Sequence, residues 1–142
     1  MRKRLLKNER GAALLEAAVT IPLILLISVA IFEFGRAYQT WQVLTNAARE
    51  GARVSVISGT SDAQVTDAVR NYMTIGRLDK AASAPVDINR TVPLGDTTAS
   101  EITISYPFDF IVLGPVARLV VPTSSAGASL TMSAVAIMRN EG

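Results

Sequence analysis

The sequence of 142 residues contains no cysteine and no histidine. Without cysteine the chain cannot form disulfides or thiolate metal sites, so an exported domain must be held together by packing alone. Without histidine it lacks the commonest general base and the commonest zinc ligand. Both absences argue against an enzyme. We therefore predict no catalytic residues, no cofactor and no metal site.

The positive charge of the chain is concentrated at its N-terminus. Residues 1–11 contain one acidic side chain and five basic ones, which are Arg2, Lys3, Arg4, Lys7 and Arg10. The whole chain has 14 basic and 12 acidic residues, which leaves nine basic and eleven acidic ones for residues 12–142. The leader thus has a net charge of +4 and the remainder a net charge of −2. Because a nucleic-acid surface needs basic residues clustered on the folded domain, we predict no nucleic-acid partner.

One apolar run, residues 12–32, is long enough to cross a membrane. It is interrupted by Glu16, Thr20, Pro22 and Ser28. As a helix it would span about 30 Å, which matches the hydrocarbon core of a bilayer. Because the basic leader lies on one side, the positive-inside rule places the N-terminus in the cytoplasm. We expect a cytoplasmic leader at 1–11, a transmembrane helix at 12–34 that contacts the lipid bilayer, and an extracytoplasmic domain at 35–142.

Glu16 is an ionisable residue inside this run, where an acidic side chain at the helix centre costs about 2.5 to 3.5 kcal/mol. Three interpretations stay open. The run is a secretory signal cut after Ala30, or an uncleaved anchor whose glutamate reaches the cytoplasmic interface. Alternatively, the chain is cut between Gly11 and Ala12, because a glycine five residues before a glutamate resembles a type IV prepilin processing site.

In the third interpretation each residue has a physical role. Gly11 lets a protease approach the backbone closely. The new ammonium group of Ala12 and the carboxylate of Glu16 are four residues apart, so they can meet on one helix face. Glu16 also lies in the first helical turn, where the helix dipole favours negative charge. If its partner is the ammonium group of a neighbouring subunit, homo- or hetero-oligomers form through this helix.

Helical periodicity continues beyond the apolar run. One stripe of apolar residues contains Phe34, Tyr38, Trp41, Leu44, Ala48 and Ala52. The stripe predicts one continuous helix from about Ala12 to Arg53, with Tyr38 and Trp41 packed in the core rather than in a membrane belt. A second helix is predicted from about Asp62 to Ile75, after a capping box formed by Ser61 and Gln64.

After Pro85 the apolar period changes to two. The alternation predicts strands at 86–92, 102–106 and 130–138, with a hairpin loop between the first two. The apolar stretch 108–121 is either a short helix on the sheet or a second contact with the membrane surface. The predicted fold class is therefore α+β and pilin-like. One long N-terminal helix, half membrane-spanning and half amphipathic, packs on a small antiparallel sheet of about three strands, with one or two short helices.

Three segments together resemble the TadE-like family, the pseudopilins or minor pilins of the tight-adherence (Flp/Tad) pilus system. They are Arg10 to Glu16 (RGAALLE) with the apolar helix behind it, Asn46 to Arg53 (NAAREGAR), and Ile104 to Phe108 (ISYPF). The resemblance implies a substrate of a prepilin peptidase, cut after Gly11, with Glu16 as the characteristic glutamate of the mature N-terminus. It also implies a role in assembling an adhesive pilus at the bacterial cytoplasmic membrane. The implied partners are other pilins and Tad assembly membrane proteins.

Two positions depart from the usual pilin pattern. Ala12 stands where many pilins have phenylalanine, and Ala17 stands where the major Flp pilins have tyrosine. The second departure favours an accessory subunit over a bulk filament subunit. An alternative of a different class stays open, namely an uncleaved single-pass membrane protein whose extracytoplasmic domain binds a ligand or a partner.

Overall fold

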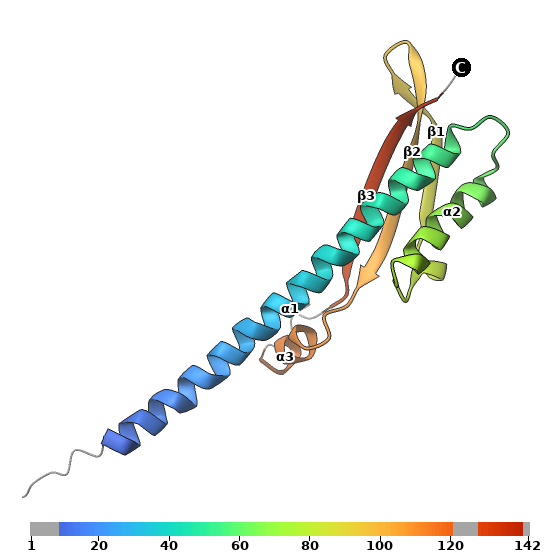
Figure 1. Cartoon of the computed structure of the whole chain (residues 1–142). Helices are drawn as coiled ribbons and strands as arrows, with labels where there is room; N and C mark the ends of the chain where they lie inside the picture. The colour runs from blue at the N-terminus through green and yellow to red at the C-terminus, as the bar shows by residue number, and fades with distance from the viewer. Residues whose placement is uncertain (1–8, 121–127, 141–142) are drawn as a thin grey trace, which may run out of the picture.

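A computed structural model describes residues 9–120 and 128–140 of the chain. Its dominant element is α1, a helix of 47 residues at Glu9–Ser55, which is about 70 Å long. The N-terminal half of α1 extends away from the remainder of the protein, and the C-terminal half packs against it (Figure 1). Pro22 lies inside α1, and the helix continues on both sides of it. The prediction of one continuous helix is confirmed, with slightly wider bounds.

The second helix, α2, spans Asp62–Ile75 as predicted. Its capping box is also confirmed, because the amide of Gln64 donates to Ser61 Oγ at 3.4 Å and the amide of Ser61 donates to Gln64 Oε1 at 2.9 Å. A short 3₁₀ helix, η1, follows at Ala81–Ser83. The two helices α1 and α2 lie against each other on the same side of the sheet (Figure 1).

The three predicted strands form one antiparallel sheet in the order β1-β2-β3. Their bounds are Val86–Leu94 for β1, Thr97–Phe108 for β2 and Leu130–Arg139 for β3. The hairpin between β1 and β2 turns at Gly95, whose φ of 61° is in the left-handed region that favours glycine. The strands extend further than predicted, because pairing of Pro93 with Thr98 takes up most of the expected loop.

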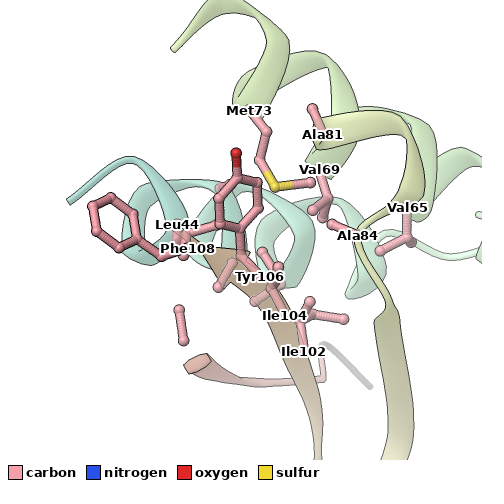
Figure 2. Close-up of a cluster of buried hydrophobic side chains, with 14 of the residues drawn as sticks. Leu44, Val65, Val69, Met73, Ala81, Ala84, Ile102, Ile104, Tyr106 and Phe108 are labelled. Atoms are coloured by element: carbon pink, nitrogen blue, oxygen red, sulfur yellow. The ribbon is translucent and has the colours of Figure 1, made fainter. Parts of the chain in front are cut away.

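The hydrophobic core lies between the sheet and the two helices. The central strand β2 supplies alternate residues to it, including Ile102, Ile104 and Phe108 (Figure 2). Leu44 on α1 and Met73 on α2 are fully buried against this face. The sheet therefore packs on the long helix, as the sequence predicts.

The prediction that Tyr38 and Trp41 pack in the core is wrong, and Phe34 on the same stripe is exposed as well. Phe34, Tyr38 and Trp41 are exposed, with exposed fractions of 63%, 62% and 46%. Before Leu44, the buried residues of α1 each lie one position before a residue of the predicted stripe; they are Glu33, Ala37 and Thr40. From Leu44 onward the buried residues include those of the predicted stripe. Small residues face the core here because neighbouring elements approach the helix closely.

The third helix, α3, spans Leu113–Val120 and follows the end of β2. It contacts α1 and lies beside it, beyond the end of the sheet (Figure 1). A short helix was one of the two expectations for this stretch, but its position on the sheet was wrong. Part of the stretch, residue 121, lies outside the described residues.

Candidate functional site

The residues of the predicted processing site lie on the free half of α1. Gly11, Ala12 and Glu16 are exposed there, and Arg10 is in the first turn of the helix. The other basic residues of the predicted leader, Arg2, Lys3, Arg4 and Lys7, lie outside the described residues. Cleavage after Gly11 stays a prediction.

Glu16 makes no ion pair or side-chain hydrogen bond within the described part of the chain. It borders a shallow groove on the helix surface, whose other lining residues are Ala13, Ala17, Thr20 and Ile21. No residue in the most apolar stretch of α1 is buried, although Val29 and Ala30 near its end are partly covered. If this stretch lies in a bilayer, the carboxylate needs a partner from another molecule or a position that faces water.

Where α1 leaves the apolar run, a buried carboxylate connects the helix to the end of the sheet. Glu33 is 4% exposed. Its Oε1 accepts a hydrogen bond from the amide of Val112 at 2.7 Å, and its Oε2 accepts one from Arg36 Nη2 at 3.1 Å. Both oxygens are therefore satisfied, as a buried carboxylate requires.

Arg36 extends this connection to the last residues of β2. Its Nη2 also donates to the carbonyl oxygen of Asp109 at 2.5 Å. Its guanidinium carbon lies 4.4 Å from the centre of the Phe108 ring, a cation–π contact. Lys80, at the loop before η1, pairs with the carboxylate of Asp109 and holds the pKa of that carboxyl below its usual value.

A second hydrogen-bonded pair lies next to these ions. The hydroxyl of Tyr106 donates to Asp79 Oδ1 at 2.5 Å, and this bond lowers the pKa of Asp79. Burial, reinforced by the hydrogen bond to Asp79, raises the pKa of Tyr106 to about 12. We refer to Glu33, Arg36, Lys80, Tyr106 and Asp109 with their partners as the junction cluster. It borders a cavity of about 280 Å³.

The junction cluster was missed in the sequence analysis. A signal was present, because Glu33 stands at the end of the apolar run three residues before Arg36, a spacing that favours an ion pair on a helix. The junction cluster has a structural role, because the carboxylates of Glu33 and Asp109 are already paired with Arg36 and Lys80. Among residues 9–120 and 128–140, no group of three or more acidic, histidine or cysteine side chains is placed to hold a metal ion.

The NAAREGAR segment forms the packed part of α1. Ala47, Ala48 and Ala52 are fully buried, whereas Glu50 and Arg53 form an ion pair of 2.6 Å on the solvent side. Gly51 faces α2 and β2 so closely that a Cβ atom built on it would lie 2.5 Å from Val69 Cγ2. The small residues therefore let three elements meet, and the charged residues form the outer surface of the helix.

Residues 11–53 match the family model of TadE-like proteins. The chain carries a TadE-like N-terminal region. The match runs from the glycine of the predicted cut to the last arginine of the NAAREGAR segment, so it covers almost all of α1. Comparison with curated proteins and with solved structures gave no match.

The TadE-like region thus contains both the exposed apolar half of α1 and its closely packed half. The packed half, α2, the sheet and α3 together form what we call the head domain. The ISYPF segment of β2 lies outside the match, although it contributes Tyr106 and Phe108 to the junction with α1. TadE-like proteins are pilus components rather than enzymes, and an apolar helix of this length fits a membrane-anchored member of that system.

Proposed function

We propose that this protein is a membrane-anchored pseudopilin or minor pilin that acts in the assembly of a Flp/Tad-type adhesive pilus. The observation that carries the proposal is the exposed apolar half of a TadE-like helix with an unpaired Glu16 on its surface. In the proposed topology the leader is in the cytoplasm of a bacterium, residues 12–34 cross the cytoplasmic membrane once, and the head domain lies outside. A prepilin peptidase removes residues 1–11.

Cleavage would create a positively charged partner for the Glu16 carboxylate. The new ammonium group at Ala12 stands one helical turn from the carboxylate, and groups four residues apart on a helix are about 5–6 Å apart at their Cβ atoms. The groove beside Glu16 is lined by Ala13 and Ala17, and small residues let a second helix approach closely in lipid. Pairing of Glu16 with the ammonium group of another pilin would then fix the axial register of the two helices.

The first test is the mass of the mature protein. The full chain is extracted from membranes of cells with and without a prepilin peptidase, and its intact mass is measured. We expect loss of residues 1–11 only when the peptidase is present. Gly11→Leu should block the cut because its side chain obstructs the backbone, whereas Gly35→Leu should not, since no atom lies within 4 Å of a Cβ at that position. An intact Met1 or a start at Ile31 would contradict the proposal.

The second test separates a pilin from a plain anchored domain. Glu16→Gln removes the charge while keeping the shape, and we expect normal membrane insertion with loss of pilus assembly. Glu50→Gln is the matched control, because Glu50 lies on the same helix in an exposed ion pair, a type worth only about 0 to 1 kcal/mol. Unchanged piliation in Glu16→Gln cells would favour the alternative, an uncleaved single-pass protein with a partner-binding domain.

A further inference from the structure

The position of α3 along α1 is fixed by the junction cluster. The hydrogen bond from the Val112 amide to Glu33 places the start of α3 beside the residue that follows the apolar run. Figure 1 shows α3 between the end of the sheet and the free half of α1. Val29 and Ala30, close to the end of the apolar run, are partly buried, unlike most of that run. The helix α3 therefore lies beside the part of α1 that would leave the bilayer.

The outer surface of α3 is apolar. Val112, which immediately precedes α3, and Val116 and Leu119 within it follow the spacing of one helix face; they are 41%, 36% and 82% exposed. Ile111, just before them, is 67% exposed. From Phe110 to Val120 the only charged side chain is Arg118, a cation. Apolar side chains grouped this way on a surface mark a contact with another apolar medium.

Continuity with α1 identifies this medium as lipid. Phe32, the last residue of the apolar run, is 81% exposed, and the ring of Phe34 lies 6.1 Å from the ring of Phe110 in an edge-to-face contact. The exposed aromatic surface of α1 thus contacts Phe110, which leads into the α3 region. The hydrocarbon core of about 30 Å is filled by residues 12–32, so α3 falls at its outer boundary. Glu33 is buried near that boundary, and its carboxylate accepts the hydrogen bond from the Val112 amide.

We propose that α3 is an interfacial helix, which lies in the outer face of the membrane with Val112, Val116 and Leu119 turned toward the lipid. A short amphipathic helix with an apolar face and a cation suits this layer. Because the Val112 amide joins the start of α3 to Glu33, lipid contact on α3 and on α1 would together set the orientation of the head domain above the membrane. The inference depends on the proposed membrane anchoring of α1.

The absence of cysteine makes a direct test possible. Leu119→Cys places a single nitroxide spin label on α3, and Ile57→Cys places one at an exposed aliphatic position just beyond the C-terminal end of α1. Leu25→Cys labels the apolar run. Each full-length variant is reconstituted in vesicles of phosphatidylcholine and phosphatidylglycerol, and collision rates with oxygen and with a water-soluble nickel chelate are measured.

We expect the ratio of oxygen to nickel collisions at 119 to be several-fold higher than at 57 and lower than at 25. A ratio at 119 equal to that at 57 would place α3 in water and overturn the proposal. Low collision rates with both reagents would show that protein covers α3, which also overturns it. The label at 25 reports the anchor separately: if it is in lipid while 119 is not, only the inference on α3 fails. Val116→Cys gives a second reading on the same face.

Discussion

Gly51 offers the sharpest test of how the TadE-like helix holds the head domain. A Cβ atom at this position would lie 2.5 Å from Val69 Cγ2 and 3.3 Å from Ile102 Cγ2. Both neighbours are fully buried and β-branched, so they have little freedom to turn away. Gly51→Ala would gain about 0.8 to 1.0 kcal/mol from helix propensity and lose about 1 to 3 kcal/mol from overpacking. We expect a net loss of stability of up to about 2 kcal/mol.

Gly35→Ala is the matched control, because Gly35 is in the same helix and has no atom within 4 Å of the new Cβ. It should stabilise the protein by the propensity gain alone, so the difference between the two variants isolates the overpacking. That difference, about 1 to 3 kcal/mol, corresponds to at least about 4 °C in the midpoint of thermal unfolding for a domain of this size. The assay is circular dichroism of the full chain in detergent micelles. If Gly51→Ala raises the midpoint as much as Gly35→Ala does, the close approach of α1, α2 and β2 is refuted.

Four further predictions concern the junction cluster. Glu33→Ala should cost about 1.5 to 3 kcal/mol, the usual value of hydrogen bonds to a charged group, and should speed hydrogen exchange at the Val112 amide. The pKa of Asp79 is lower in the folded protein than its ordinary value of 3.8, so ionised Asp79 stabilises the fold above pH 3.8. This stabilisation is lost as the pH falls through the pKa of the folded state, and acid titration followed by NMR should detect the loss. Tyr106→Phe should move that titration to higher pH by removing the donated hydrogen bond. In the unchanged protein, the stabilisation from the raised pKa of Tyr106 is fully present below pH 10 and is lost as the pH rises toward about 12. Alkaline unfolding measures this loss of stability.

Local signals predicted the helices and strands well. The capping box of Ser61 and Gln64 and the following apolar spacing define α2 because both act within a few residues of the chain. Alternation in β2 predicts which residues face the core, since its burial follows the same period of two. These features depend only on residues that are close together in the sequence, so the sequence pattern predicts them directly.

The stripe of α1 and the junction cluster depend instead on distant partners. Large aromatic residues were expected to face the core, but apart from Glu33 and Leu44 the buried face of α1 consists of small residues such as Ala37 and Ala47. Glu33 is buried because residue 112, which is 79 positions away, brings its amide to the carboxylate. Periodicity along one helix does not contain this information and could not predict that Glu33 is buried.

The unbroken length of α1 has a mechanical consequence. From Phe32 to Ser55 the helix rises about 35 Å, and its packed half is fixed to the sheet and to α2. A tilt of about 10° at the membrane would therefore carry the far end of the head sideways by about 6 Å, given the helical rise. If α1 is anchored as proposed, a small change of its angle in the bilayer would thus become a larger displacement at the far end of the head domain.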